Sequence, residues 1–280
     1  MGICWRCLCR RLLTTFRVGG HDALFLIADK LGDVPDLIYI DTSIDLHFDA
    51  NGEDPDRYSP TMRAYHRQLW SKPLPTGGVF ELDEVFPKGY LLYRSEPRNI
   101  MMASDAIIRT FRTHQRMQHI LTRIPEEERA EFSRLGYSIG GMMLFPKNQI
   151  DRKQTINQVR GMDGKVEDRF DLTLECIRRH YEDRSWTPLA EVLERYAHFF
   201  DLFSDFKGYV DFWLLQDLVT TDYKQIRFFS PFNDFTASAL IGSVEEYVQY
   251  RALTLDFLRG RNARIDALNT VQEPESCGKQ

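Results

Sequence analysis

The sequence predicts an α+β fold, in which strands and helices occupy different parts of the chain. Strand-like segments gather in the first half of the 280 residues, whereas amphipathic helical patterns dominate the second half. This order argues against an alternating βαβ fold, because the two kinds of element are segregated along the chain. The length and the 43% apolar content suit one globular domain with a large core. We expect that domain over residues 37–262, with strands packed against a Phe-rich helical half.

The two ends of the chain are expected to lie outside this domain. Residues 1–36 are interpreted as a poorly ordered extension and residues 263–280 as a disordered tail, since neither has a periodic apolar face. The five cysteines, three of them within the first nine residues, do not resemble a disulfide framework and favour a reduced compartment. The net charge of −5 argues against a strongly basic nucleic-acid-binding protein. No apolar run approaches the roughly 18 residues of a membrane-spanning helix, so no membrane partner is expected.

The first half is predicted to begin with a buried strand at 37–40 and an acidic, solvated loop over 41–56. Ser59-Pro60 then indicates a helix start, because Ser is a favoured N-cap and Pro fits the first turn. Lys72-Pro73 ends this helix. His66 lies beside its apolar stripe, where we favour a hydrogen-bonded core histidine over a site residue.

Three apolar runs predict strands at 89–94, 99–104 and 137–146. Asp105 follows the second strand and is, with His66, a weaker candidate for a functional site. Gly140 and Gly141 fall inside the third strand, where glycine marks a bulge or the close approach of backbone or ligand. Both glycines are therefore candidates for a ligand site.

Residues 107–124 are predicted to form an amphipathic helix with a basic face. That face carries Arg109, Arg112, Arg116 and Arg123. It could follow the phosphates of a nucleic acid. We favour an ordinary solvated helix face, because charged residues on exposed helices are the usual case.

The second half is predicted to be mostly helical after a short strand-like segment at 155–159. The clearest helix covers 165–181, where apolar residues recur every three or four positions. Residues 207–219 are apolar nearly all round and predict a buried central helix. Residues 243–261 predict a last amphipathic helix.

Candidate site residues gather around the helix at 165–181. Arg169 and His180 flank its apolar stripe, and Asn157 and Arg160 precede it. Arginine binds phosphate and carboxylate groups with two parallel hydrogen bonds, so this set could hold an anionic ligand. The alternative is an internal network of ion pairs, which collects the same residue types.

Asp211 shares a face of the apolar helix at 207–219 with leucines. A buried carboxylate needs a partner, so we expect Asp211 to be buried and bonded to Arg160, Arg169 or Arg178. No metal site is predicted, because Asp171 and Glu175 lie one turn apart without a histidine at the matching turn. No motif identifies a cofactor.

The chain resembles a family of bacterial proteins of unknown function over residues 40–262. The strings that carry the resemblance are Asp41-Thr42-Ser43, Asp54-Pro55-Asp56, Tyr58-Ser59-Pro60-Thr61, Tyr65-His66, Leu69 to Pro75, Ser104-Asp105, Ile139 to Met142, Phe145-Pro146, Ile156-Asn157, Arg160-Gly161, Asp168-Arg169, Asp171 to Arg179, Gly208-Tyr209-Val210 and Leu214 to Val219. The resemblance implies a bacterial, cytoplasmic setting and implies no activity.

Two functions therefore remain open from the sequence. The first is a protein, catalytic or only ligand-binding, with one polar site where Arg160 and Arg169 meet the strand of Gly140-Gly141. Its ligand would be small and anionic, with a phosphate-like or nucleotide-like group. The second is a non-catalytic interaction protein, such as a defence-system accessory protein, in which the Arg/Asp cluster is structural.

Overall fold

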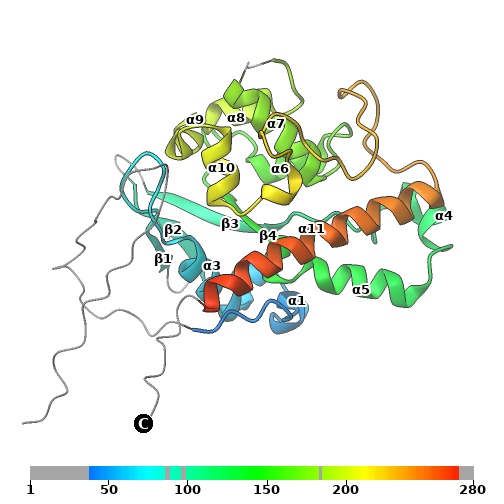
Figure 1. The fold of residues 1–280 in the computed structure, drawn as a ribbon, viewed down its shortest axis with the longest axis horizontal. Coiled ribbons are helices and arrows are strands. Elements are labelled where there is room, and N and C mark those ends of the chain that lie inside the picture. Colours follow the sequence, from blue (N-terminus) through cyan, green and yellow to red (C-terminus); the bar gives the residue numbers. More distant parts are fainter. Residues whose placement is uncertain (1–37, 86–88, 96–98, 183–184, 271–280) are drawn as a thin grey trace, which may run out of the picture. The chain divides into compact units, whose positions relative to one another are not determined.

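The computed structural model describes residues 38–85, 89–95, 99–182 and 185–270. Within them, a four-stranded antiparallel sheet lies in the first half of the chain and the longer helices lie mainly in the second half (Figure 1). The predicted α+β class is confirmed. Residues 1–36, predicted to be an extension, lie outside the described part of the chain. None of the helices in the described part is both long and apolar enough to cross a membrane.

The sheet contains strands β1 (Leu82–Val85), β2 (Tyr90–Tyr93), β3 (Ile100–Ala106) and β4 (Met142–Pro146), in the order β1-β2-β3-β4. β3 pairs with β4 as far as Ala106, which lies opposite Met142. On its other side β3 pairs with β2 only as far as Met102. The last residues of β3 therefore have a free edge. Asp56 occupies that edge, because its carboxylate accepts the Ser104 N–H at 2.7 Å.

Short helices fill the connections of the first half. They are α1 (Leu46–Asp49), α2 (Pro55–Tyr58), α3 (Pro60–Trp70), α4 (Gln118–Leu121) and α5 (Glu126–Gly136). The predicted start of α3 is confirmed: the Ser59 hydroxyl accepts the Met62 N–H at 2.9 Å, and Pro60 is the first helical residue. The acidic segment over 41–56 is not a simple loop, since it contains α1 and the start of α2.

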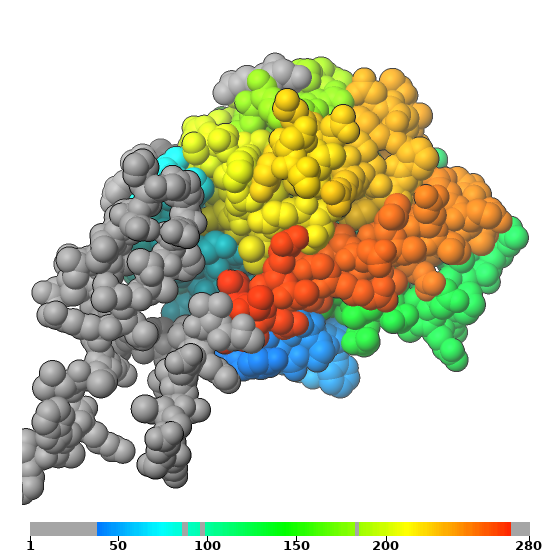
Figure 2. Space-filling view, in the orientation of Figure 1, coloured from blue at the N-terminus to red at the C-terminus, as the bar shows by residue number. Residues whose placement is uncertain are grey.

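The second half contains α6 (Ile156–Met162), α7 (Phe170–Glu182), α8 (Ala190–Arg195), α9 (Ala197–Phe200), α10 (Phe206–Phe212) and α11 (Val244–Thr270). In Figure 1, α6 to α10 lie on one side of the sheet, with α1, α3 and α5 on the other. Figure 2 shows α11, in orange and red, running between the yellow second-half helices and the blue and green surfaces of the first half.

Alternation along β3 fixes which helices meet each face of the sheet. Successive side chains of a strand point to opposite faces. The Ser104 hydroxyl lies 2.9 Å from His66 of α3, whereas the next residue, Asp105, lies 2.8 Å from Arg160 of α6. α3 and α6 therefore cover opposite faces near the free edge of β3.

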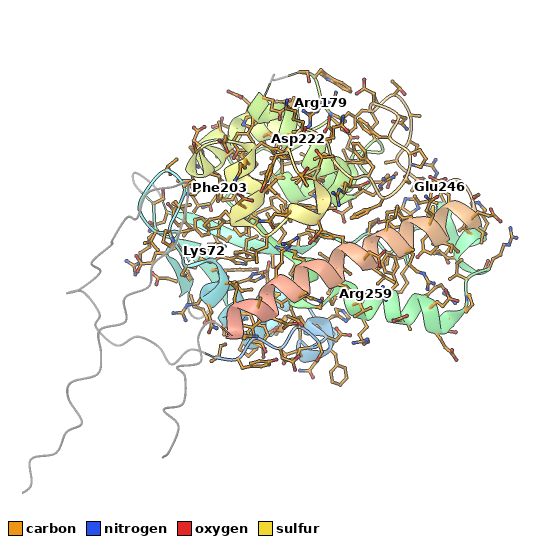
Figure 3. All side chains as sticks on the ribbon, in the orientation of Figure 1. Lys72, Arg179, Phe203, Asp222, Glu246 and Arg259 are labelled. Carbon is orange, nitrogen blue, oxygen red and sulfur yellow. The ribbon has the colours of Figure 1, made fainter. Side chains whose placement is uncertain are left out.

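The expected Phe-rich core joins the two halves. Phe203 packs against Phe80 from the first half with ring centroids 6.4 Å apart, and Trp70 of α3 packs against Trp213 at 4.9 Å. Figure 3 labels Phe203 within this aromatic cluster and Lys72 beside it. The Lys72 ammonium donates to the Phe212 carbonyl at 2.6 Å, which satisfies one of the last carbonyls of α10.

Arg261 of α11 closes the same end of α10 from inside the core. It is fully buried and donates to the carbonyls of Trp213, Gly140 and Met142 at 2.8–3.2 Å. No carboxylate of the described residues forms an ion pair with it, and burial lowers the pKa of Arg261 to about 9. Arg261 therefore links α10, β4 and α11 through backbone carbonyls and the Met143 sulfur.

Three predicted elements of the first half are wrong in kind or extent. Residues 38–40 are not a strand, and Leu37 is outside the described residues. Residues 107–124 do not form one helix: only a 3-10 turn at 115–117 and α4 are helical. The Tyr247 hydroxyl donates to the Thr110 carbonyl, and the Tyr250 hydroxyl donates to the Arg109 carbonyl. These two carbonyls therefore do not accept hydrogen bonds within a helix. The strand predicted at 137–146 begins at Met142, after a 3-10 turn at Ile139–Gly141.

Four second-half predictions also need correction. The helix predicted at 165–181 begins only at Phe170. Residues 155–159 begin a helix rather than a strand, because Thr155 and Gln158 form a capping box at the start of α6. The helix predicted at 207–219 ends at Phe212, and Leu214 then adopts a left-handed φ of 56°. α11 continues to Thr270, so the tail predicted from 263 starts too early. Residues 271–280 lie outside the described part of the chain.

Candidate acid–base site at the end of strand β3

Arg160 and Arg169, which were expected to share one site, engage separate groups. Arg160 binds Asp105 at 2.8 Å and lies 3.3 Å from Asp168. Arg169 binds Asp171 at 2.6 Å and contacts neither of those carboxylates. The predicted single cluster is therefore two clusters, and they differ in how much solvent reaches them.

The Arg160 guanidinium is completely buried and fully engaged by the protein. Besides Asp105, it donates to the Thr173 hydroxyl and to the Asp168 carbonyl, both at 3.2 Å. The rings of Phe145 and Phe170 lie 5.5 and 5.9 Å from its central carbon. Arg160 thus has little capacity to bind an external anion, and its effect is to hold the Asp105 carboxylate in place.

A turn with left-handed backbone conformation holds Asp168 beside Arg160. Glu167 and Asp168 are consecutive non-glycine residues in the left-handed region, with φ of 48° and 61°. Such a conformation persists only where the surroundings impose it, and it is common at functional sites. Here the Asp168 N–H donates to the Arg160 carbonyl at 2.9 Å, while its carboxylate reaches Arg109 at 3.7 Å.

Three neighbouring side chains leave a buried polar atom without a hydrogen-bond partner. They are Arg109 at Nε, His114 at Nδ1 and Asp168 at Oδ1; the 3.3 Å contact of that oxygen with Arg160 lacks hydrogen-bond geometry. His114 is joined to this group through Glu167, at 3.4 Å. Buried polar atoms are nearly always paired, by protein or by ordered water. Because these atoms have almost no accessible surface, their gathering points to a place that ordered water completes.

Asp105 and Asp56 are the carboxyl groups whose proton affinity is most altered. Burial raises the pKa of Asp105 to about 7, although Arg160 acts to lower it and Asp168 to raise it. Burial likewise raises the pKa of Asp56 to about 7, against the Ser104 N–H, which lowers it. The Asp105 side chain nevertheless remains 30% exposed. Both groups can exchange a proton near neutral pH, and solvent reaches Asp105. We call Asp56, Asp105, Arg160, Asp168, Arg109 and His114 the acid–base site.

His66 has a structural role on the face of the sheet opposite Asp105, in line with the preferred interpretation of a hydrogen-bonded core histidine. The indole N–H of Trp70 can only donate, so Nδ1 of His66 must accept that 3.0 Å bond. Burial lowers the pKa of His66 to about 3, which keeps the imidazole neutral and its hydrogen on Nε2. Nε2 therefore donates to the Ser104 hydroxyl and cannot remove a proton from it.

The four arginines of the predicted basic face do not share one surface. Arg109 turns toward Asp168, whereas Arg112, Arg116 and Arg123 are exposed. Burial raises the pKa of Tyr137, while Arg112 lowers it and Asp105 raises it, so Arg112 and Asp105 both act on the Tyr137 hydroxyl. Arg112 is thus an exposed cation that acts electrostatically on the same hydroxyl as Asp105.

The second cluster, around Arg169, has the features of a structural ion pair. Arg169 makes two bonds to Asp171, and their side chains are 3% and 0% exposed. It also donates to the Ser230 hydroxyl at 2.7 Å and the Ala239 carbonyl at 3.2 Å. The Phe229 N–H donates to Asp171 at 3.0 Å. These bonds fix the long segment between Phe229 and Ala239 to the start of α7.

Gly140 and Gly141 are closely approached by other parts of the protein. A Cβ on Gly140 would lie 2.0 Å from the Asn262 side-chain oxygen, and one on Gly141 would lie 2.1 Å from the Gly136 carbonyl oxygen. The sequence predicted a close approach at these glycines. The approaching group belongs to α11 at Gly140 and to the end of α5 at Gly141.

The predicted pairing of Asp211 with an arginine is wrong. Its side chain is 35% exposed and bonds to Lys207, to Tyr223 at 2.8 Å and to Gln216 at 3.1 Å. The helix ends one residue later, so the apolar face that would have buried Asp211 is not continuous. Asp211 therefore does not belong to the acid–base site.

The remaining candidates lie on α6 and α7. Asn157 precedes Arg160 by one turn on α6, and its Oδ1 is buried without a partner. His180 lies near the C-terminal end of α7, with its ring 5.4 Å from that of Phe200 and its Nδ1 4.0 Å from Glu194. His180 is thus in the surroundings of α8 and α9, apart from Asp105.

Asp56 and Asp168 were missed as individual candidates, although both belong to strings of the family resemblance. Asp54-Pro55-Asp56 was interpreted as part of a solvated acidic loop, and Asp168 fell within the helix predicted at 165–181. The available signal was the repeated occurrence of aspartate beside Pro, Ser or Arg in those strings. Among the described residues, no three His, Cys, Asp or Glu side chains are grouped so that they could hold a metal ion.

Comparison with known proteins identifies the family alone. Neither the curated proteins nor the solved structures gave a match. The family match covers residues 40–265, in agreement with the span of the resemblance. The chain belongs to DUF6994, a family of unknown function.

Proposed function

We propose that this chain is an enzyme that uses Asp105 as a general acid–base toward a small polar ligand bound at the acid–base site. The observation that carries the proposal is a carboxyl group with a pKa of about 7 that solvent can reach and that a fully buried arginine holds in place. A general acid–base works best with a pKa near the working pH, and pKa values altered in this way concentrate at active sites.

The roles of the other residues follow from their contacts. Arg160 is a positioning residue, because it bonds Asp105 but is sealed from solvent. Arg109, whose side chain is 28% exposed, can donate hydrogen bonds to the ligand from the accessible part of its guanidinium, and His114 lies beside this group through Glu167. Asp56 supplies a second carboxyl group of similar proton affinity on the free edge of β3. A negatively charged group on the ligand would meet Arg109 and Arg112, since Arg160 is already engaged.

The alternative is a non-catalytic interaction protein whose Arg/Asp contacts are structural. The Arg169–Asp171 pair supports that interpretation for its own cluster, because all its bonds are internal. It does not account for the raised pKa of Asp105, whose side chain remains partly exposed. A bacterial, cytoplasmic setting, as the resemblance implies, is part of either proposal.

A ligand screen followed by turnover assays tests the proposal. Nucleotides, phosphosugars and neutral sugars would be screened by thermal shift against the full chain, and compounds that bind would be assayed for conversion. Asp105→Asn should retain binding and lose conversion by about 100-fold or more, the usual contribution of a general acid–base. Asp256→Asn, at an exposed position 73% accessible, is the matched control and should convert normally. Conversion that survives Asp105→Asn would contradict the proposal.

A further inference from the structure

A small cavity lies beside Arg169, and none of its lining residues belongs to the acid–base site. Its volume is about 80 Å³. The lining includes Lys165 and Arg169 near the start of α7, Ser230, Asn233 and Ser238 from the segment before α11, and Glu246 of α11. Arg169 and Ser230 are buried, whereas Asn233 and Ser238 are exposed, so the cavity has a closed floor and an accessible rim. Figure 2 shows the gold 230–240 segment beside the orange start of α11.

The hydroxyl groups in this cavity have hydrogens left to donate. Ser230 Oγ accepts from Arg169 at 2.7 Å, and Ser238 Oγ accepts the Leu240 N–H at 3.3 Å. A hydroxyl that already accepts still carries one O–H donor. Both serines therefore offer a hydrogen to an additional acceptor, and the Asn233 amide on the rim can donate as well.

Lys165 is the lining residue whose charge has no carboxylate partner among the residues that the structure describes. Arg169 is neutralised by its two bonds to Asp171. Glu246 is the acid of the lining, and its Oε2 accepts the Gly242 N–H at 2.8 Å near the start of α11 (Figure 3). Lys165 contacts the Trp186 ring, with its ammonium 4.8 Å from the ring centroid, and forms no ion pair within the described residues.

We infer that this cavity is a second binding site, which takes a small oxyanion, a phosphate or carboxylate group, through the Lys165 ammonium and the Ser230 and Ser238 hydroxyls. Donors without acceptors and one unpaired cation call for a ligand that accepts hydrogen bonds and carries negative charge. The volume admits a single such group and excludes a whole nucleotide, because pockets for drug-sized ligands measure about 300 Å³ or more. Glu246 on the lining disfavours a ligand of high negative charge.

The inference does not rest on the acid–base chemistry, and its test uses other variants. Inorganic phosphate and acetate would each be titrated into the full chain by calorimetry near neutral pH, at constant ionic strength. Lys165→Gln should weaken binding of the preferred anion about tenfold or more, as expected for loss of a charge-assisted hydrogen bond. Ser230→Ala should weaken it by a smaller factor.

Two controls separate the site from general surface charge. Lys224→Gln removes an exposed lysine elsewhere and should leave the affinity unchanged, and Asp256→Asn, on the exposed surface of α11, should do the same. Thermal unfolding of each variant would confirm that it remains folded. The inference is overturned if neither anion binds at concentrations on the order of 10 mM. It is equally overturned if Lys165→Gln and Lys224→Gln have equal effects.

Discussion

Asp56 should reduce the stability of the fold at neutral and alkaline pH. Its folded-state pKa is raised from 3.8 to about 7. The folded chain therefore holds the proton more tightly than the unfolded chain does. The stabilisation linked to this group is complete below about pH 4 and is lost as the pH rises through about 7. Asn mimics the protonated form and keeps an oxygen for the Ser104 N–H.

The size of the effect follows from the shift in pKa. Each pKa unit corresponds to about 1.4 kcal/mol, so a shift of about three units sets an upper limit of about 4 kcal/mol. Partial solvation of the side chain reduces this to about 2–4 kcal/mol. Asp56→Asn should raise the free energy of unfolding by that amount near pH 8 and leave it unchanged below about pH 4.

Urea unfolding across this pH range measures the effect directly. Asp256→Asn, on the exposed surface of α11, controls for the loss of one negative charge and should show little pH-dependent change. A gain in stability that is the same at every pH, or no gain near pH 8, would refute the reasoning. Retention of a carboxyl group that destabilises the fold is expected where function requires it.

Two other predictions concern the rest of the fold. Asp171→Asn should lower the free energy of unfolding by about 3–5 kcal/mol, because it leaves buried Arg169 without its counter-charge. Urea unfolding measures this loss. A loss under about 1 kcal/mol would show that the ion pair is dispensable for stability. Ending the chain after Asn262 should also destabilise it, by about 3–5 kcal/mol, because it removes fully buried Ile265 and the two Asn269 bonds to Ile40. An unchanged melting temperature would instead support the tail boundary predicted from sequence.

Local signals predicted the parts of the fold that depend on short stretches of sequence. Ser59-Pro60 identified the start of α3, because N-cap chemistry depends on a few neighbouring residues. The same kind of signal was present at Thr155 and Gln158, where the capping box outweighs the strand-like composition of five residues. The prediction of a helix at 107–124 was wrong for a non-local reason. Two tyrosine hydroxyls from α11, which is distant in sequence, donate hydrogen bonds to backbone carbonyls of this segment.

The candidate site was harder to predict because it forms only when distant segments meet. Arg160 was predicted to bind an anionic ligand or Asp211, but its partner Asp105 is set by the packing of β3 against α6. Asp211 was misplaced because the length of α10 decides whether that carboxylate is buried. No local pattern marks the left-handed turn that places Asp168 beside Arg109.

The proton affinity of Asp105 is the most direct test of the proposed acid–base site. The full chain, labelled with carbon-13 at the aspartate carboxyl groups, would be titrated by NMR, and the Asp105 signal assigned by its absence in Asp105→Asn. We predict a midpoint at about pH 7, because burial outweighs the opposing effect of Arg160. A midpoint near the ordinary value of 3.8 would mean that Arg160 keeps Asp105 ionised as a structural ion pair, and would contradict the proposed catalytic role.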